Sequence, residues 1–392
     1  MDFTRYNPRV YERVVGATLR SSRASVLLLG PRQTGKSTLL RALAPDLVLD
    51  LADPATFRDY VAYPEKLAAE LRGASAGVRT VMLDEVQRVP ALLDVVQVLV
   101  DERPRRFRFL LSGSSARKLR RGQANLLPGR VQVHQLHPLL LAELAGDADL
   151  ERVMAHGSLP GIYAETDARE RAAMLRAYAH TYLREEIQAE ALVRDVGGYS
   201  RLLDLVAASS GRIVNLAALS RDVGIGHETA RRYLDVMRDT LVAFDVPAFA
   251  GSDRASLVAH PKTFLFDCGV RNALLRRPLD RVLDDDRGLL LEHVVGYELH
   301  RRIGTHWPDG RLSHYRTKHG AEVDFVLEIG RERWGIEVKA GRHVHRADLS
   351  GLESLAARAR LARRVVVFLG ARAQSIDGVD VLPLDRFLGE LN

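Results

Sequence analysis

The sequence predicts a multidomain α/β protein, with one α/β domain at each end and a mainly helical part between them. Apolar, strand-like runs alternate with helical stretches over the first 145 residues. A period-two alternation returns near residues 322–340, as expected of paired strands. The chain has 392 residues, 46% of them apolar and 27% charged, which is long enough for two or three domains of ordinary soluble composition.

The first informative stretch is VLLLGPRQTGKSTLLRAL, residues 26–43. It predicts a buried strand over Val26–Leu29, a glycine-flanked turn and a helix opening at Lys36. The spacing G-x-x-x-x-G-K-S indicates a phosphate-binding loop, in which main-chain N–H groups and the lysine hold the phosphates of ATP. The candidate nucleotide-binding residues are Gly30, Pro31, Arg32, Gln33, Thr34, Gly35, Lys36, Ser37 and Thr38.

A second strand-like run, Thr80–Leu83, ends in Asp84 and Glu85. Because ligands lie at the carboxyl ends of parallel strands, these two acids should face the same crevice as the phosphate loop. The Ser37 hydroxyl and Asp84 suit a Mg²⁺ ion, directly or through water, and Glu85 is placed to polarise the water that attacks the γ-phosphate.

A further strand, Arg108–Leu111, ends in a serine-rich turn. A hydroxyl there would lie between the phosphate loop and the acidic pair. It could form a hydrogen bond with the γ-phosphate or with the attacking water. Ser112 and Ser114 both fit this position, and a simple turn without a function is the alternative.

The stretch from Arg103 to Ala142 contains no acidic residue and many arginines. Such a stretch can contact nucleic-acid phosphates, face water, or meet acidic patches of a neighbouring subunit. Within it, Arg130 precedes a strand at Val131–Gln135 and is a candidate to reach a nucleotide, either in its own chain or across a subunit interface.

The motifs GPRQTGKST, VMLDEVQ, FLLSGSS and LPGRV, followed by LHPLLLAEL, resemble those of prokaryotic AAA+ ATPases that carry a C-terminal domain of unknown function. The resemblance extends over nearly the whole chain. It implies a five-stranded parallel sheet for residues 20–145 and supports the roles given to Lys36, Ser37, Asp84, Glu85 and Arg130.

The middle of the chain predicts a helical segment and then a DNA-binding motif. Residues 146–197 form either a helical lid over the nucleotide or a plain helical connection. In residues 198–260, helices at Leu216–Val223 and His227–Arg238 flank a glycine turn and resemble a winged helix-turn-helix. Its second helix would expose Glu228, Thr229, Arg231 and Arg232 to DNA, although such modules also serve as protein spacers.

The last domain, residues 261–392, predicts a hairpin with an acidic face. If Glu322–Ile329 pairs with Trp334–Ala340 across Gly330–Arg333, Ile329 lies opposite Trp334 and Asp324 opposite Lys339. Alternation then places Val323, Phe325, Leu327, Ile329, Trp334, Ile336 and Val338 on one face. Asp324, Glu337 and Lys339 share the other.

Two carboxylates on one face can hold a divalent metal such as Mg²⁺ against a phosphodiester, and Lys339 could offset the charge that develops on the phosphate. A helix-borne acid often completes such a site, and Glu292 is favoured over Glu298. The α-β-β-β-α-β order with D-x₁₂-E-x-K resembles the PD-(D/E)xK nuclease core, with Val323 where the proline would be. A scaffold without nuclease activity is the alternative.

Taken together, these motifs predict an AAA+ core at 1–145, a lid, a winged-helix-like connector and a restriction-endonuclease-like domain. ATP turnover would gate DNA binding or metal-dependent DNA cleavage; the alternative is a nucleotide-dependent switch with a non-catalytic C-terminal binding domain. A net charge of +7 favours an anionic partner, and homo-oligomerisation is possible. With no membrane-spanning run, no signal-peptide pattern and the single Cys268, the expected location is the cytoplasm.

Overall fold

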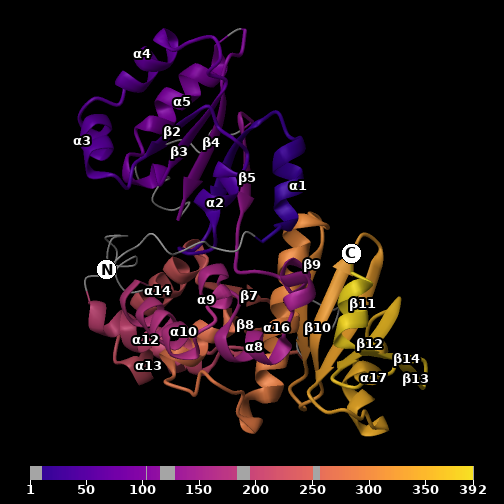
Figure 1. The fold of residues 1–392 in the computed structure, drawn as a ribbon. Helices are drawn as coiled ribbons and strands as arrows, with labels where there is room; N and C mark the ends of the chain where they lie inside the picture. The colour runs from indigo at the N-terminus through magenta and orange to yellow at the C-terminus, as the bar shows by residue number, and fades with distance from the viewer. Residues whose placement is uncertain (1–10, 103, 115–128, 183–194, 250–256, 392) are drawn as a thin grey trace. The chain divides into compact units, whose positions relative to one another are not determined.

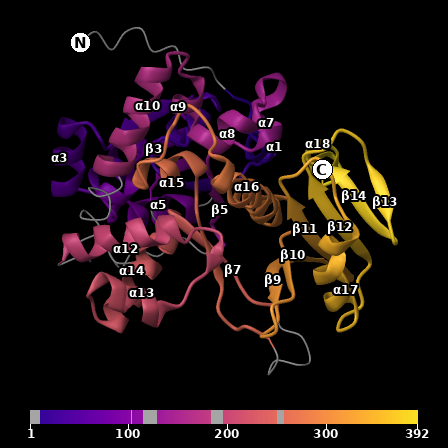
Figure 2. The ribbon, with the colours of Figure 1, turned by 90° about the horizontal axis from the view of Figure 1, so that it is seen from below.

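The computed structural model describes residues 11–102, 104–114, 129–182, 195–249 and 257–391, which belong to two compact units (Figures 1 and 2). The first unit comprises residues 1–145, 159–164 and 235–242, and the second comprises residues 146–158, 165–234 and 243–392. Within the described residues, no helix is long and apolar enough to cross a membrane.

The first unit is built on a five-stranded parallel sheet with the order β2-β3-β4-β1-β5 (Figure 1). Its strands are β1 Ser25–Leu29, β2 Leu47–Asp50, β3 Thr80–Asp84, β4 Arg108–Gly113 and β5 Val131–Gln135. The expected five-stranded parallel sheet is therefore confirmed. Because β4 separates β1 from β3, the phosphate loop and the acidic pair lie at the ends of strands that are not direct neighbours.

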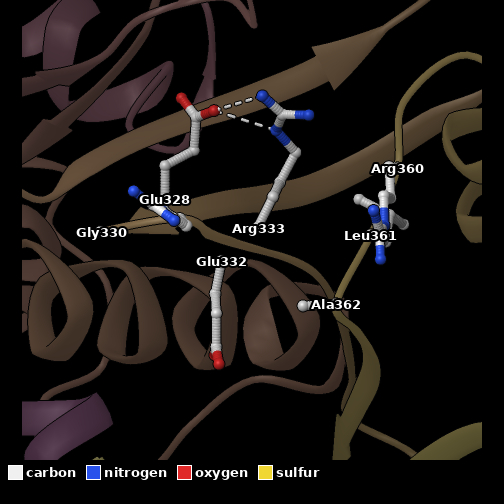
Figure 3. Close-up of a pocket in the computed structure, with 8 residues that line it drawn as sticks. Glu328, Gly330, Glu332, Arg333, Arg360, Leu361 and Ala362 are labelled. Carbon is white, nitrogen blue, oxygen red and sulfur yellow. Dashed lines mark hydrogen bonds and ion pairs between the residues drawn. The ribbon is translucent and has the colours of Figure 1, made fainter.

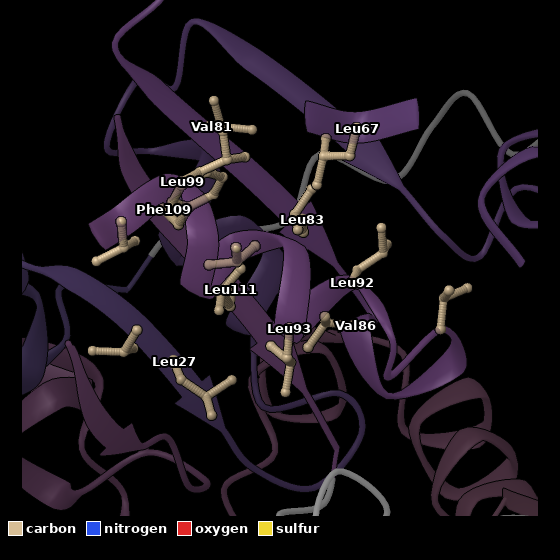
Figure 4. Packing of buried hydrophobic residues seen from close by; sticks show 14 of the residues in the cluster. Leu27, Leu67, Val81, Leu83, Val86, Leu92, Leu93, Leu99, Phe109 and Leu111 are labelled. Carbon is tan, nitrogen blue, oxygen red and sulfur yellow. The ribbon is translucent and has the colours of Figure 1, made fainter. Parts of the chain in front are cut away.

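Helices pack against this sheet and bury its strands. They are α1 Val14–Ser21, α2 Lys36–Arg41, α3 Pro54–Ala62, α4 Lys66–Gly73 and α5 Leu92–Asp101. The first unit also contains α7 Leu141–Leu144 and α9 Pro160–Ala164. Every residue of β1 is buried, as is typical of a parallel strand covered on both faces. Figure 4 shows Leu27 of β1, Leu83 of β3 and Leu111 of β4 packed with Leu93 of α5.

The second unit opens with helices that pack against α15, Cys268–Leu274. These are α8 Leu150–His156, α10 Ala168–Ala177 and the π-helical turn Tyr178–Tyr182 that continues α10. The Asp267 carboxylate caps α15 through the Val270 N–H at 2.9 Å and also accepts the Ser158 N–H at 2.7 Å. This shared acid ties the helices that were expected to form a lid to the second unit.

The two helices expected in the middle of the chain are present, and the second ends one residue later than predicted. Their similarity to a winged helix-turn-helix stays a prediction. Helix α12, Val196–Ala208, precedes α13, Leu216–Val223, and α14, His227–Asp239. Gly224 adopts φ = +76°, which allows the sharp turn between α13 and α14. A three-stranded sheet follows, in which β8 lies between β6 and β7. These strands are β6 Arg212–Ile213, β7 Ala243–Val246 and β8 Lys262–Leu265, so the boundary expected at residue 260 falls within one sheet.

The end of the second unit is a six-stranded mixed sheet with the order β13-β14-β12-β11-β10-β9 (Figure 2). Its strands are β9 Arg311–Arg316, β10 Glu322–Ile329, β11 Glu332–Lys339, β12 Arg363–Phe368, β13 Gln374–Ile376 and β14 Val379–Pro383. The helices are α16 Asp284–Thr305, α17 Ser350–Ala356 and α18 Leu384–Gly389. The expected α-β-β-β-α-β order is therefore present.

Two helices cover opposite faces of this sheet. A Cβ on Gly296 of α16 would lie 2.7 Å from the Phe325 ring, and a Cβ on Gly335 would lie 2.9 Å from Leu352 of α17. Phe325 pairs with Ile336, so Gly335 points to the other face. Each helix therefore approaches the sheet closely at these glycines, and a side chain at either position would have to displace Phe325 or Leu352.

The register predicted for the β10–β11 hairpin was wrong by two residues. Ile329 lies opposite Glu332, and Leu327 rather than Ile329 lies opposite Trp334. The connection is the two-residue turn Gly330–Arg331, with Gly330 at φ = +57°, and not the four-residue loop that was expected. Continuing the register by one pair places Asp324 opposite Glu337 instead of Lys339.

Candidate functional site

The phosphate loop connects β1 to α2 and has the backbone that its glycines predict. Gly35 has φ = +89°, and Gln33 also adopts a positive φ of +62°. A Cβ on Gly30 would lie only 2.0 Å from the Leu136 carbonyl oxygen, so glycine is required there. The Thr34 hydroxyl turns inward and donates to the Pro31 carbonyl at 2.9 Å. Any contact of Thr34 with a nucleotide would therefore use its main chain.

The Lys36 side chain is folded over this loop and is only 5% exposed. Its Nζ donates to the carbonyl oxygens of Gly30 at 2.8 Å and Pro31 at 2.9 Å. Both acceptors are neutral, so an anionic phosphate would be a stronger partner for the ammonium group. Thr38 and Gln33 are exposed beside it, whereas Pro31 is buried and Arg32 is half-buried.

The carboxylate of Asp84 joins the phosphate loop to the neighbouring strands. The Ser37 hydroxyl donates to Asp84 Oδ1 at 2.9 Å, and the Ser112 hydroxyl donates to the same oxygen. Ser112 in turn accepts the main-chain N–H of Glu85 at 3.0 Å. Ser112, not Ser114, therefore contacts the acidic pair; Ser114 is buried just beyond β4.

Glu85 follows β3 in a left-handed backbone conformation, with φ = +58°. Non-glycine residues rarely adopt this conformation outside turns and functional sites. Its Oε2 accepts a hydrogen bond from Gln87 Nε2 at 2.5 Å. Sequence reasoning missed Gln87, although it lies only two residues from the predicted catalytic acid in the motif DEVQ.

Arg13 is a second residue that sequence reasoning missed. Its guanidinium is buried and donates to the Thr34 carbonyl at 2.8 Å and the His137 carbonyl at 2.5 Å. The same group forms an ion pair with Glu143, with Nε 3.1 Å from Oε2. Arg13 therefore fixes the main chain of the phosphate loop against the segment that follows β5. No local motif around Arg13 indicated this position.

Arg130 and the phosphate loop lie at opposite ends of the parallel strands. It immediately precedes β5, whose Val131 pairs with Ser25 at the beginning of β1. Because the strands are parallel, the phosphate loop follows their other ends. Arg130 Nε donates to Asp101 at 2.7 Å. Arg130 is therefore not placed at the phosphate loop of its own chain, and its contact with a nucleotide of a neighbouring subunit stays a prediction.

The predicted acidic face of the C-terminal sheet contains an additional residue, Lys262. Its Nζ lies 2.8 Å from Glu292 Oε1, 2.9 Å from Glu322 Oε1 and 3.3 Å from Asp324 Oδ1. We call these four residues the acidic centre. Burial alone would lower the pKa of Lys262, but the surrounding carboxylates outweigh it and raise that pKa.

A β-bulge directs Asp324 into the acidic centre. The pairing of β10 with β9 shifts between Val323 and Val326. Val323 packs in one cluster with Val326 and Leu352 of α17, whereas Phe325 contacts α16. The prediction that Val323 shares a face with Phe325 was therefore wrong. Sequence patterning assumes strict alternation, which a bulge interrupts.

Glu337 and Lys339 form a pair beside the acidic centre. Lys339 Nζ donates to Glu337 Oε1 at 2.9 Å. Burial, followed by the nearby Asp324 charge, raises the pKa of Glu337 to about 8, while Lys339 opposes the shift. Burial, followed by the Asp324 charge, likewise raises the pKa of Glu292 to about 8, while Lys262 opposes the shift. Glu298, the rejected alternative, instead pairs with Arg302 in a fully buried position.

The predicted metal ligands therefore do not form one cluster. Glu292 and Asp324 meet around Lys262, and Glu337 is held by Lys339. Over the described ranges of the chain, no three acids, histidines or cysteines are arranged to hold a metal ion. Sequence reasoning missed Lys262 and Glu322. The available signal for Lys262 was a lysine at the start of the apolar run KTFLF.

The candidate DNA-binding surfaces are only partly described. Glu228, Arg231 and Arg232 of α14 are exposed, and Thr229 is half-buried. Five basic residues of the predicted stretch lie outside the described residues: Arg103, Arg117, Lys118, Arg120 and Arg121.

A hollow of about 650 Å³ lies at the tip of the β10–β11 hairpin (Figure 3). The Arg333 guanidinium there is paired with Glu328 at 2.6 Å, and the rim mixes arginines with acids. This hollow therefore shows no preference for one sign of ligand charge.

Models of known protein families match successive parts of the chain. Residues 147–281 match a domain of unknown function, DUF8612, and residues 287–387 match another, DUF4143. The uncharacterized proteins Mb2031c of Mycobacterium bovis and Rv2008c of Mycobacterium tuberculosis are each 29% identical over 370 residues, or 93% of this chain and 80% of theirs.

Two solved structures show only weak similarity. AMPPCP-bound DnaA from Aquifex aeolicus has a TM-score of 0.27 at 15% identity, covering 57% of this chain and 84% of that one. Protein VC1899 from Vibrio cholerae has a TM-score of 0.21 at 14% identity, covering 94% and 96%. Neither score supports a conclusion. Residues 22–145, which carry the phosphate loop and the acidic pair, match the model of the AAA domain, and this match supports an AAA-type ATPase domain in that part of the chain.

Proposed function

We propose that the protein binds ATP with Mg²⁺ and hydrolyses it to ADP and phosphate. The observation that carries this proposal is the chain of contacts from Ser37 through Asp84 to Ser112, beside Lys36 and Glu85. It joins the ends of β1, β3 and β4, the edge at which parallel sheets bind ligands. Lys36 and the loop N–H groups would hold the phosphates.

The residues present fit a magnesium ion. The Ser37 hydroxyl and the Asp84 carboxylate are 2.9 Å apart and are both hard oxygen ligands of the kind that Mg²⁺ prefers. When bound, Mg²⁺ would neutralise phosphate charge. Ser112 keeps Asp84 oriented and is near enough to the Glu85 main chain to couple the two acids.

Glu85 is the proposed general base. Its carboxylate is held by Gln87 and stands at the end of β3 next to Asp84. A carboxylate in this position orients the attacking water and accepts its proton, a role that typically contributes 10²–10⁴-fold to a rate. Arg130 completes the proposal as a group that acts on the nucleotide of a neighbouring subunit.

The experiment is a comparison of Glu85→Gln with wild type. We expect Glu85→Gln to keep ATP affinity, because the amide preserves shape, and to lower kcat by at least about 100-fold. Glu65→Gln, at an exposed acid of the same unit, is the matched control and should turn over ATP normally. Wild-type turnover by Glu85→Gln would reject the assignment, and no ATP binding by wild type would reject the whole proposal.

A second candidate function, metal-dependent DNA cleavage by the C-terminal domain, is favoured by the bulge that directs Asp324 toward Glu292 of α16. Glu337 and Lys339 stand on the neighbouring strand, as in the E-x-K part of the predicted motif. ATP turnover would gate this cleavage. The alternative is a switch whose C-terminal domain binds DNA or protein without cutting.

Cleavage of plasmid and branched DNA in Mg²⁺ separates these alternatives. Wild type should cut, and Asp324→Ala should not. Asp377→Ala changes an exposed acid of the same domain and is the control. Absence of cleavage by wild type across substrates and metals favours the non-catalytic switch.

A further inference from the structure

A cavity of about 360 Å³ is lined by α10, by its π-helical continuation and by the end of α15. Figure 2 shows α10 and α15, which pack against each other. The volume is in the range of small-molecule binding sites. The lining residues are Arg176, His180, Ala273, Arg276, Arg277 and Leu279. All six belong to the second unit, so the cavity is separate from the phosphate loop.

The lining of this cavity combines basic side chains with apolar ones. Ala273 and Leu279 are buried, at 2% and 4% exposure. The other four residues supply three guanidinium groups and an imidazole, and no acid is among the six. The hollow at the tip of the β10–β11 hairpin differs, because glutamates mix with its arginines. The cavity beside α15 therefore favours an anionic ligand.

Two of the three arginines have unpaired side chains. Arg176 and Arg276 are exposed, and neither side chain forms a hydrogen bond or an ion pair with any residue that the structure describes. Arg176 lies four residues before His180, so the two share one face of α10 and its π-helical turn. Turns of this kind occur often at functional sites. Like charges that line one cavity repel each other, and a bound anion would relieve that repulsion.

Arg277 is positioned by acids that lie outside the cavity. Its Nε is 3.0 Å from Asp286 Oδ2, and its Nη2 is 3.9 Å from Asp285 Oδ2. Asp286 also pairs with the buried Arg271 at 3.0 Å, so this one acid is shared by two arginines. Neither aspartate lines the cavity. Arg277 is thus held in place while its charge is only partly compensated.

The backbone carries an arginine where a glycine commonly ends a helix. The Arg276 N–H donates to the Ala273 carbonyl at 3.1 Å, and the Arg277 N–H donates to the Asn272 carbonyl at 2.9 Å. These two bonds are the Schellman pattern, and Arg276 takes its glycine position with φ = +54°. Strained non-glycine residues are concentrated at functional sites. A cation near a helix C-terminus is also favourable by itself, so binding must be separated from folding.

The number of unpaired charges indicates the ligand. A phosphate monoester carries about −1.5 to −2 charges at pH 7, which matches two guanidinium groups. Guanidinium groups bind phosphate oxygens through pairs of parallel hydrogen bonds. We propose that this cavity binds a small phosphate monoester, held by Arg176 and Arg276 with Arg277 as a fixed third contact. The site is independent of the proposed ATP hydrolysis.

The test measures binding of phenyl phosphate to the full-length chain by calorimetry. Every protein carries Lys36→Ala, which weakens the phosphate loop equally in all of them. We expect a Kd of about 1 mM or lower. Arg176→Gln should weaken binding at least about tenfold, because a charge-assisted hydrogen bond is lost. Arg342→Gln, at an exposed arginine of the same unit outside the cavity, is the matched control and should not change the affinity.

Arg276→Gly separates binding from folding. Glycine adopts φ = +54° without strain, so this variant should melt no lower than the parent protein and yet bind at least about tenfold more weakly. A lower melting temperature with unchanged affinity would make Arg276 a structural residue and overturn the proposal. Absence of binding by the parent protein, or an equal loss in Arg342→Gln, would overturn it too.

Two further ligands test the chemical class. Benzoate carries a single negative charge and should bind at least about tenfold more weakly than phenyl phosphate. Equal affinities would reject the choice of phosphate. If a single-stranded oligonucleotide binds through the same arginines and phenyl phosphate does not, the cavity contacts nucleic acid and the proposal is rejected.

Discussion

Two buried lysines, Lys36 in the first unit and Lys262 in the second, show opposite ways of holding a positive charge. Lys36 donates to two neutral carbonyls of its own loop. Lys262 contacts three carboxylates that come from another helix and another strand. Both side chains are almost fully shielded from water, at 5% and 2% exposure. Burial therefore does not distinguish them, and the charge of their partners does.

This difference separates a lysine that donates to main-chain carbonyls from one that is surrounded by acids. A phosphate is a stronger acceptor for an ammonium group than a neutral carbonyl, so a bound phosphate would gain a strong partner in Lys36. Carboxylates compensate Lys262 fully, so its loss leaves uncompensated acid behind. The comparison leads to four predictions.

The largest expected effect is on stability. Lys262→Ala should lower the free energy of unfolding by about 3–5 kcal/mol, because it leaves three buried acids without their cation. Lys36→Ala should cost less than about 1 kcal/mol, because the acceptors at 2.8 and 2.9 Å from its ammonium group are neutral main-chain carbonyls and not acids. Urea denaturation of both variants measures the two values. Equal losses in the free energy of unfolding would contradict the proposed difference between the two lysines.

For ATP affinity we expect the reverse of the order given for stability: the change at Lys36 should have the larger effect, and the change at Lys262 the smaller. Lys36→Ala should weaken ATP binding about 10- to 100-fold, since a charge-assisted hydrogen bond contributes roughly 1.5–3 kcal/mol. Lys262→Arg should bind ATP as wild type does. Fluorescent ATP titration in Mg²⁺ gives both constants. Undiminished affinity in Lys36→Ala would contradict the role of the loop.

Lowering the pH should reduce the folding stability of the second unit, and we expect His156 to contribute to this loss. Burial, and next the charge of Arg171, lower the pKa of His156 to about 4. The unfolded chain takes up this proton near pH 6.5, so the stability from neutral His156 is complete above that pH and is lost as pH falls toward 4. We expect about 1–2 kcal/mol from this group. Denaturation of wild type and His156→Gln between pH 7 and 4 should show a shallower loss in the variant.

The smallest effect concerns Gln87. Its amide holds Glu85 by one hydrogen bond, so Gln87→Ala should change kcat by less than about tenfold and leave ATP affinity intact. Steady-state ATPase kinetics check this. A loss as large as that of Glu85→Gln would mean that Gln87 itself contacts the reacting groups.

The sequence was a good guide where the position of a residue depends on a local motif. The phosphate loop is contiguous, and the acids of DEVQ follow a strand whose apolar run is unmistakable, so Lys36, Asp84 and Glu85 could be placed in advance. The choice of Ser112 over Ser114 could not, because it depends on how β4 is positioned between β1 and β3.

Long-range pairing was where the sequence failed. Lys262 is 62 residues from Asp324, and nothing in either segment indicates the other. The hairpin register also failed, because the turn length was taken as four and Gly330 allows a turn of two. The bulge beside Asp324 follows from how β9 fits β10, which no residue pattern encodes.

The position of Arg13 has a consequence for how nucleotide occupancy could be communicated. A single guanidinium links the Thr34 carbonyl in the phosphate loop to the His137 carbonyl, just before the chain leaves the first unit near residue 145. Any rearrangement of the loop backbone must stretch one of these bonds or pull the exit segment along. Arg13 thus works as a tether between the phosphate loop and the segment that follows β5.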